Sequence, residues 1–82
     1  MGTLQTYLQA AMDHAEFETL PEQEGVFGRI PGLDGLWANG PTMAQCRDEL
    51  ESALEDWVLV GLRLGHRMPE VGGVSLPLPE VA

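Results

Sequence analysis

One long amphipathic pattern, between residues 42 and 64, constrains the fold of this chain more than any other feature. Apolar residues recur along one side at the spacing of a helix, and acidic or polar residues occupy most of the other side. Thr42 and Gln45 form a capping-box pair at its start, and Gly65 and Pro69 follow its end as stop signals. The sequence therefore predicts a helix of about 20 residues. Its apolar side requires a second layer of structure to cover it.

Shorter patterns elsewhere in the chain supply that second layer. Residues 3–14 carry apolar side chains at helical spacing and predict a short amphipathic helix. Residues 15–20 and 26–30 alternate between apolar and polar types around a turn segment, which predicts a β-hairpin. A third strand is expected over residues 36–39, and one short edge strand could follow at residues 74–76. The expected fold is α+β: a two-layer αβββα arrangement in which both helices cover one face of a three-stranded antiparallel sheet.

The other face of the predicted sheet has no element to cover it. Because strand side chains alternate, Phe27 and Arg29 point outward if residues 26, 28 and 30 point toward the helices. Trp37 joins them if Leu36 and Ala38 are the inward pair of the third strand. Outward Phe, Arg and Trp side chains are typical anchors of protein interfaces. In the alternative register, shifted by one residue, Trp37 belongs to the core.

The charge of the chain limits the partners that it can bind. Its 82 residues include 13 acidic side chains and 4 basic ones, all Arg, for a formal net charge of −9. A phosphate-contacting surface depends on Lys and Arg, so direct binding of nucleic acid is not expected. A domain of this size has a limited core, and part of its stability is expected to come from assembly with itself, as a homodimer or homotetramer.

No segment predicts a membrane span or an export signal. The longest strongly apolar run, residues 57–64, is far shorter than the roughly 20 residues that a span requires. The first residues lack the basic and apolar regions of a signal peptide. A single cysteine, Cys46, fits a reducing compartment. The sequence therefore predicts a cytoplasmic protein.

The candidate reactive groups have ordinary structural explanations. Cys46 lies on the apolar side of the long helix and has no His near it in sequence to act as a base. His14 and His66 are isolated at helix ends and lack the spacing of a zinc site. A magnesium-dependent nuclease built on Glu16 and Glu18 would need further carboxylates within the strands. We expect no catalytic residue, no cofactor and no metal.

The outer side of the long helix carries a series of acidic residues. One interpretation is a solvated face, on which Arg47 pairs with Glu51 one turn later. The other is a contact surface for a basic partner, formed by Asp48, Glu51, Glu55 and Asp56.

Turn and cap residues follow one another in a definite order through the middle of the chain. A strand that ends in an I-P-x-L-x-G turn is followed by a G-x-x-x-x-G-x-T element that begins the long helix, and a Gly and a Pro close it. The positions that carry this pattern are Ile30, Pro31, Leu33, Gly35, Gly40, Thr42, Gly65 and Pro69. Their order resembles that of the HicB family of bacterial and archaeal antitoxins. The resemblance covers roughly residues 16–70. A HicB-like domain is expected at residues 1–70, followed by a C-terminal tail at residues 71–82.

The resemblance implies a partial ribonuclease-H-like fold without catalytic acids, acting as an antitoxin. The implied partner is HicA, a small basic toxin that cleaves mRNA. Leu36 stands where many members have Cys, and the residues after Pro69 are too few for the DNA-binding domain of full antitoxins. The first hypothesis is a non-catalytic module that binds such a toxin, and the alternative is a structural homo-oligomer without one. The expected contact residues are Phe27, Arg29, Trp37, Asp48, Glu51, Glu55 and Asp56.

Overall fold

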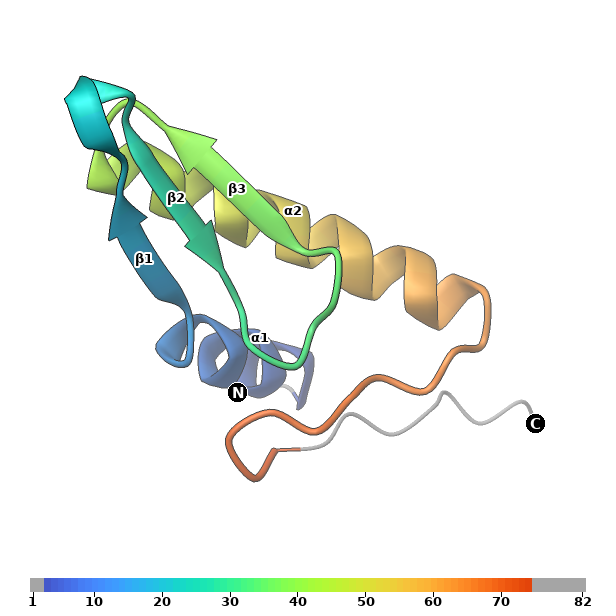
Figure 1. The fold of residues 1–82 in the computed structure, drawn as a ribbon. Coiled ribbons are helices and arrows are strands. Elements are labelled where there is room, and N and C mark those ends of the chain that lie inside the picture. Colours follow the sequence, from blue (N-terminus) through green and yellow to red (C-terminus); the bar gives the residue numbers. More distant parts are fainter. Residues whose placement is uncertain (1–2, 75–82) are drawn as a thin grey trace.

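Two helices and three strands follow one another in the order α1-β1-β2-β3-α2 in the computed structural model, which describes residues 3–74 (Figure 1). The helices are α1 (Thr3–Asp13) and α2 (Met43–Arg63), and the strands are β1 (Glu16–Thr19), β2 (Val26–Arg29) and β3 (Trp37–Gly40). This order confirms the predicted α+β fold. The third strand begins and ends one residue later than predicted.

The three strands form one antiparallel sheet in the order β1-β2-β3. A short 3-10 turn, Pro21–Gln23, joins the first two strands. On β2, Phe27 lies opposite Glu18 of β1 and Asn39 of β3, and Arg29 lies opposite Glu16 and Trp37. Consecutive strands are neighbours, so the sheet is a simple meander.

Both ends of α2 are closed by the residues that the sequence indicated. At the start, the Thr42 hydroxyl oxygen accepts a hydrogen bond from the Gln45 backbone N–H at 3.2 Å. At the end, Gly65 has a φ of +75°, and the His66 N–H donates to the Gly61 carbonyl at 2.8 Å. This is the bond of a Schellman cap, which needs a residue in the left-handed conformation.

The placement of α1 differs from the prediction. We expected both helices to cover the sheet, but α2 alone lies across its inner face, and α1 lies beside α2 at the end of the strands (Figure 1). A four-residue strand such as β2 presents two inward residues. Because α2 already covers these positions, the apolar side of α1 packs against α2 and the loop before β3 instead.

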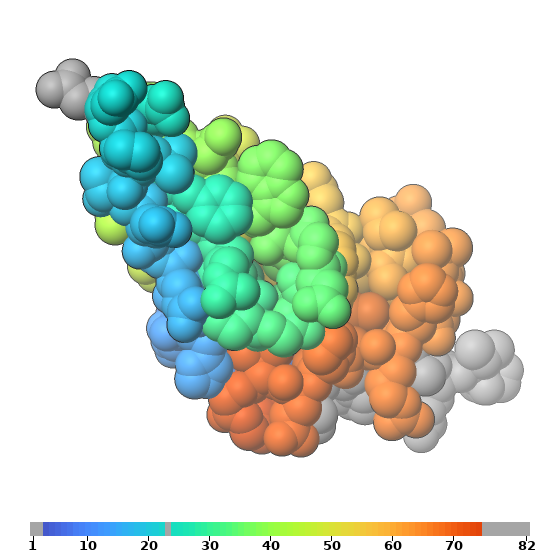
Figure 2. All heavy atoms as spheres, viewed as in Figure 1, coloured from blue at the N-terminus to red at the C-terminus, as the bar shows by residue number. Residues whose placement is uncertain are grey.

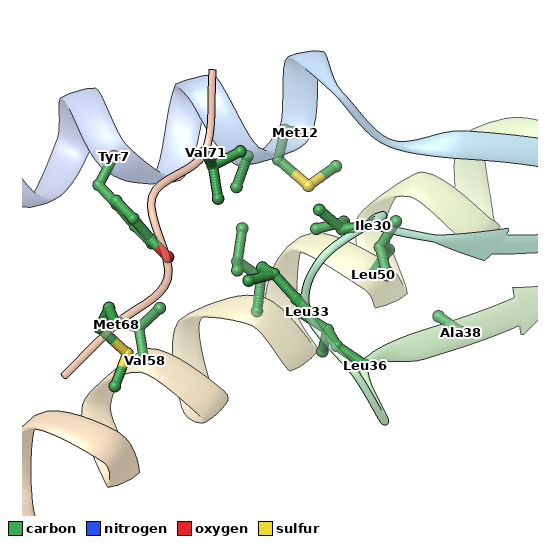
Figure 3. Packing of buried hydrophobic residues seen from close by; sticks show 12 residues of the cluster. Tyr7, Met12, Ile30, Leu33, Leu36, Ala38, Leu50, Val58, Met68 and Val71 are labelled. Carbon is green, nitrogen blue, oxygen red and sulfur yellow. The ribbon is translucent and has the colours of Figure 1, made fainter. Parts of the chain in front are cut away.

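The core lies where α1, α2 and that loop meet, as Figure 3 shows. Its largest fully buried side chains come from the two helices: Tyr7, Leu50, Leu54 and Val58. The loop contributes Ile30, Leu33 and Leu36, all buried. This cluster is continuous, so α1 and the sheet are stabilised through the same apolar contacts.

The segment after α2 returns along the core. Met68 and Val71 are buried, and Val71 and Val74 form an isolated antiparallel bridge around a two-residue turn. Within residues 3–74, this bridge does not join the three-stranded sheet. The short edge strand predicted at 74–76 lies mostly outside the described residues.

A hydrogen bond connects α1 to this returning segment. The Tyr7 hydroxyl donates to the Pro69 carbonyl oxygen at 2.6 Å, and burial raises the pKa of Tyr7 above its ordinary value of 10.0. Replacing Tyr7 with Phe is expected to lower the free energy of unfolding by about 1 kcal/mol near neutral pH. Urea denaturation of the two proteins measures this difference.

The same pKa shift predicts a pH dependence. A raised pKa favours the protonated phenol in the folded state, so its contribution to stability is full below pH 10.0 and is lost as the pH rises through the folded-state pKa. Tyr7→Phe removes this contribution, and the difference from wild type shrinks in the alkaline range. Comparison at each pH cancels the titration of Cys46, which both proteins retain. A difference that grows with pH would contradict the role of Tyr7.

Candidate protein-interaction site

The sheet exposes an aromatic pair on the face opposite α2. The rings of Phe27 and Trp37 stack with centroids 5.9 Å apart and an interplanar angle of 25°. Trp37 is 56% exposed, whereas its neighbours Leu36 and Ala38 are buried. Of the two registers considered, the structure has the one that points Trp37 outward. In Figure 2 the strand side chains form the near surface, and no helix lies in front of them.

The inner side of the sheet explains this orientation. Gly28 leaves the space that the Phe17 ring occupies, since a Cβ at Gly28 would lie 2.8 Å from that ring. Cys46 of α2 reaches the same region, with its Sγ 3.7 Å from the Ala38 carbonyl oxygen. The small residues Gly28 and Ala38 fill the inward positions near Cys46, and the large side chains of Phe27 and Trp37 lie on the outer face.

Cys46 itself is part of this packing. Its side chain is fully buried, and burial raises the pKa of the thiol above its ordinary value of 9.0. The thiol therefore stays protonated near neutral pH, which makes it a poor nucleophile. This is the structural role that its place on the apolar side of the helix predicted.

Charged side chains surround the aromatic pair. The Arg29 Nη2 lies 3.0 Å from the Glu16 Oε1, and both side chains are more than half exposed. Glu18 is exposed as well and lies opposite Phe27 in the register. Together with Phe27, these three residues line a shallow depression of about 360 Å³. The outer face thus combines aromatic area with two carboxylates and one Arg.

The acidic residues predicted on α2 belong to a different layer of the molecule. Asp48, Glu51, Glu55 and Asp56 are all exposed, but α2 lies across the inner face of the sheet. Glu51 and Glu55 line a depression shared with α1, whereas Asp56 lines a separate groove. The structure therefore brings Phe27, Arg29 and Trp37 together and leaves the helix residues apart from them.

That groove was not predicted from the sequence. It runs between the second half of α2 and residues 66–69, has a volume of about 680 Å³, and is lined by apolar side chains that include Trp57, Val60 and Leu64. By helical spacing alone, Trp57 and Leu64 belong to the core-facing side of the helix. The available signal was the run from residue 57 to 64, which is apolar on every side of the helix except at Arg63.

Among residues 3–74, no group of three or more His, Cys, Asp or Glu side chains could hold a metal ion. Neither helix in this part of the chain is long and apolar enough to cross a membrane.

The fold and the outer sheet face define a small acidic α+β domain with an exposed aromatic surface. The chain belongs to the UPF0150-like family, whose sequence model matches residues 6–69. It is similar to the crystal structure of TTHA0281 from Thermus thermophilus, with 42% sequence identity and a TM-score of 0.91. The match covers 98% of this chain and 99% of that one. A comparison with curated proteins gave no match.

Proposed function

We propose that this chain is a non-catalytic, cytoplasmic interaction module of the HicB type, which binds and neutralises a small basic toxin that cleaves mRNA. The observation that carries the proposal is the stacked Phe27–Trp37 pair on an uncovered sheet face. Membership of the UPF0150-like family, which is related to HicB-like antitoxins, supports it.

Charge supports a basic partner. The chain has a formal net charge of −9, and Glu16 and Glu18 lie beside the aromatic pair. A Lys or Arg of the partner can contact an aromatic ring with its cation and a carboxylate with its N–H groups. The acidic side of α2 lies in the other layer and acts at longer range, by steering the partner toward the complex.

The buried thiol supports a non-catalytic role. Cys46 is the chain's only cysteine, and burial both hides it and raises its pKa. On this proposal the chain neutralises the toxin by binding over its active surface, which requires a tight, complementary interface and no catalytic group.

The proposal is tested with the small basic protein encoded beside the gene of this chain, titrated calorimetrically with the full chain. We expect tight binding and inhibition of mRNA cleavage by that protein. The double variant Phe27→Ala with Trp37→Ala should weaken binding by about 10-fold to 100-fold. The matched control, Asp48→Asn with Glu55→Gln, should mainly change the association rate and its dependence on salt.

Three outcomes would contradict the proposal. One is the absence of any short basic reading frame beside the gene, and another is no binding to its product. The third is wild-type binding by the double aromatic variant, which would remove the sheet face from the interface.

A further inference from the structure

We propose that the groove beside α2 is a self-association surface, on which a second copy of this chain docks with its own α2 antiparallel to the first. The groove lies on a different part of the molecule from the sheet face and does not depend on the proposed function. Three properties of the described residues support it. The second half of α2 exposes large apolar side chains, the charges along the groove change sign, and a two-fold axis would match both features between two copies.

The second half of α2 exposes more apolar surface than a solvated helix does. Leu59, Val60 and Leu64 are 52%, 56% and 64% exposed, and they are three of the five large apolar side chains that are exposed among the described residues. A helix that is apolar on nearly all sides is normally covered on all sides. Val60 and Leu64 line the groove, whereas Leu59 does not, and exposed apolar side chains along a groove are typical of a protein interface.

Charge along α2 changes sign at the start of this region. Residues 47–56 contain five acidic side chains and one Arg. Residues 57–69 contain no acidic side chain, two Arg and one His. The apolar region is thus the part of this acidic chain that another copy can approach without repulsion.

The groove repeats this order on a smaller scale. Asp56 and Val60 line it one helical turn apart on α2, and Arg67 lines it just after the helix has ended. A two-fold axis near Val60 reverses the direction of the second copy. It therefore places Asp56 near the partner's Arg67 and Val60 near the partner's Val60. Such a surface is complementary to itself, as an isologous dimer requires.

These observations select the occupant. A purely basic partner would meet Arg67 in the groove, and a purely acidic partner would meet Asp56. A second copy running antiparallel pairs each charge with its opposite and covers Val60 with an apolar side chain.

Sedimentation equilibrium of the full chain, from micromolar concentrations upward, tests the proposal. We expect a monomer–dimer equilibrium. Val60→Asp should weaken dimerisation about tenfold or more. The matched control is Leu59→Asp on the same helix, which changes a similarly exposed residue that does not line the groove. It should leave dimerisation close to wild type. Circular dichroism checks that both variants keep their helix content.

A charge exchange tests the antiparallel arrangement. Asp56→Arg alone and Arg67→Asp alone should each weaken the dimer, because each places like charges together. The two substitutions in one chain should restore it, since the pair forms again with reversed sign. If the two residues did not contact each other across the dimer, the effects of the two substitutions on dimerisation would add in the double variant instead of cancelling.

Several results would overturn the proposal. These are a wild-type monomer throughout the concentration range, a dimer that Leu59→Asp disrupts and Val60→Asp does not, and a double charge variant as weak as the sum of its singles. A wild-type monomer that dimerises after removal of residues 75–82 would assign the groove to the chain's own C-terminal residues.

Discussion

Replacing Leu54 with Ala is expected to destabilise the fold by about 2–5 kcal/mol. Leu54 is fully buried in α2, within the cluster that joins α1, α2 and the loop before β3. The substitution removes apolar contacts and leaves a cavity that short, tightly connected elements cannot fill by moving. Small domains are stable by only about 5–15 kcal/mol. This single substitution therefore removes a large part of the total free energy of unfolding.

Leu59→Ala is the matched control for this prediction. It makes the same chemical change in the same helix, but Leu59 is 52% exposed. We expect a change within about 0.5 kcal/mol. Urea denaturation at one fixed chain concentration measures both variants, because self-association would otherwise add to the measured stability. Equal losses for the two substitutions would contradict the placement of Leu54 in the core.

Replacing Gly25 with Ala is expected to have the second largest effect. Gly25 has a φ of +108°, and a Cβ there would lie 2.5 Å from the Gly40 carbonyl oxygen. The substitution therefore combines backbone strain with a clash against the chain that leads from β3 into α2. We expect a loss of about 2–4 kcal/mol in the free energy of unfolding.

Gly32→Ala separates the two causes. Gly32 also has a positive φ, +89°, but a Cβ there would meet no atom within 4 Å. Backbone strain alone predicts a loss of about 1–2 kcal/mol. Thermal and urea denaturation of both variants give the difference, which measures the close approach between Gly25 and Gly40. If Gly32→Ala costs as much as Gly25→Ala, the approach is looser than described.

Local features of the fold could be predicted because their causes are local. The period of α2 follows from its apolar spacing, its start from the Thr42 side chain and its end from Gly65. The outward direction of Phe27 follows from strand alternation in the same way. The direction of Trp37 did not follow from the sequence alone, since two registers were compatible with its short strand. In the structure, its neighbours Leu36 and Ala38 are buried, which decides between the two registers.

Part of the candidate site could be predicted, because strand alternation and strand pairing are also local. Phe27, Arg29 and Trp37 lie on adjacent strands in register, so alternation and pairing bring them together. The acidic residues of α2 were grouped by helical position alone. Position along a helix does not show which element lies on each side of it. In the structure, Glu55 lines the depression next to α1, whereas Asp56 lines the groove next to residues 66–69.

By itself, the sequence determined the helices, the meander of strands, the caps of α2 and the acidic character of the chain, because each depends on residues close together in sequence. Only the tertiary structure decided where α1 packs, which face of the sheet stays open and that a groove flanks the second half of α2. Those features depend on contacts such as the one from Tyr7 to Pro69. A contact between residues so far apart in sequence depends on how the whole core packs, and no local pattern in the sequence specifies it.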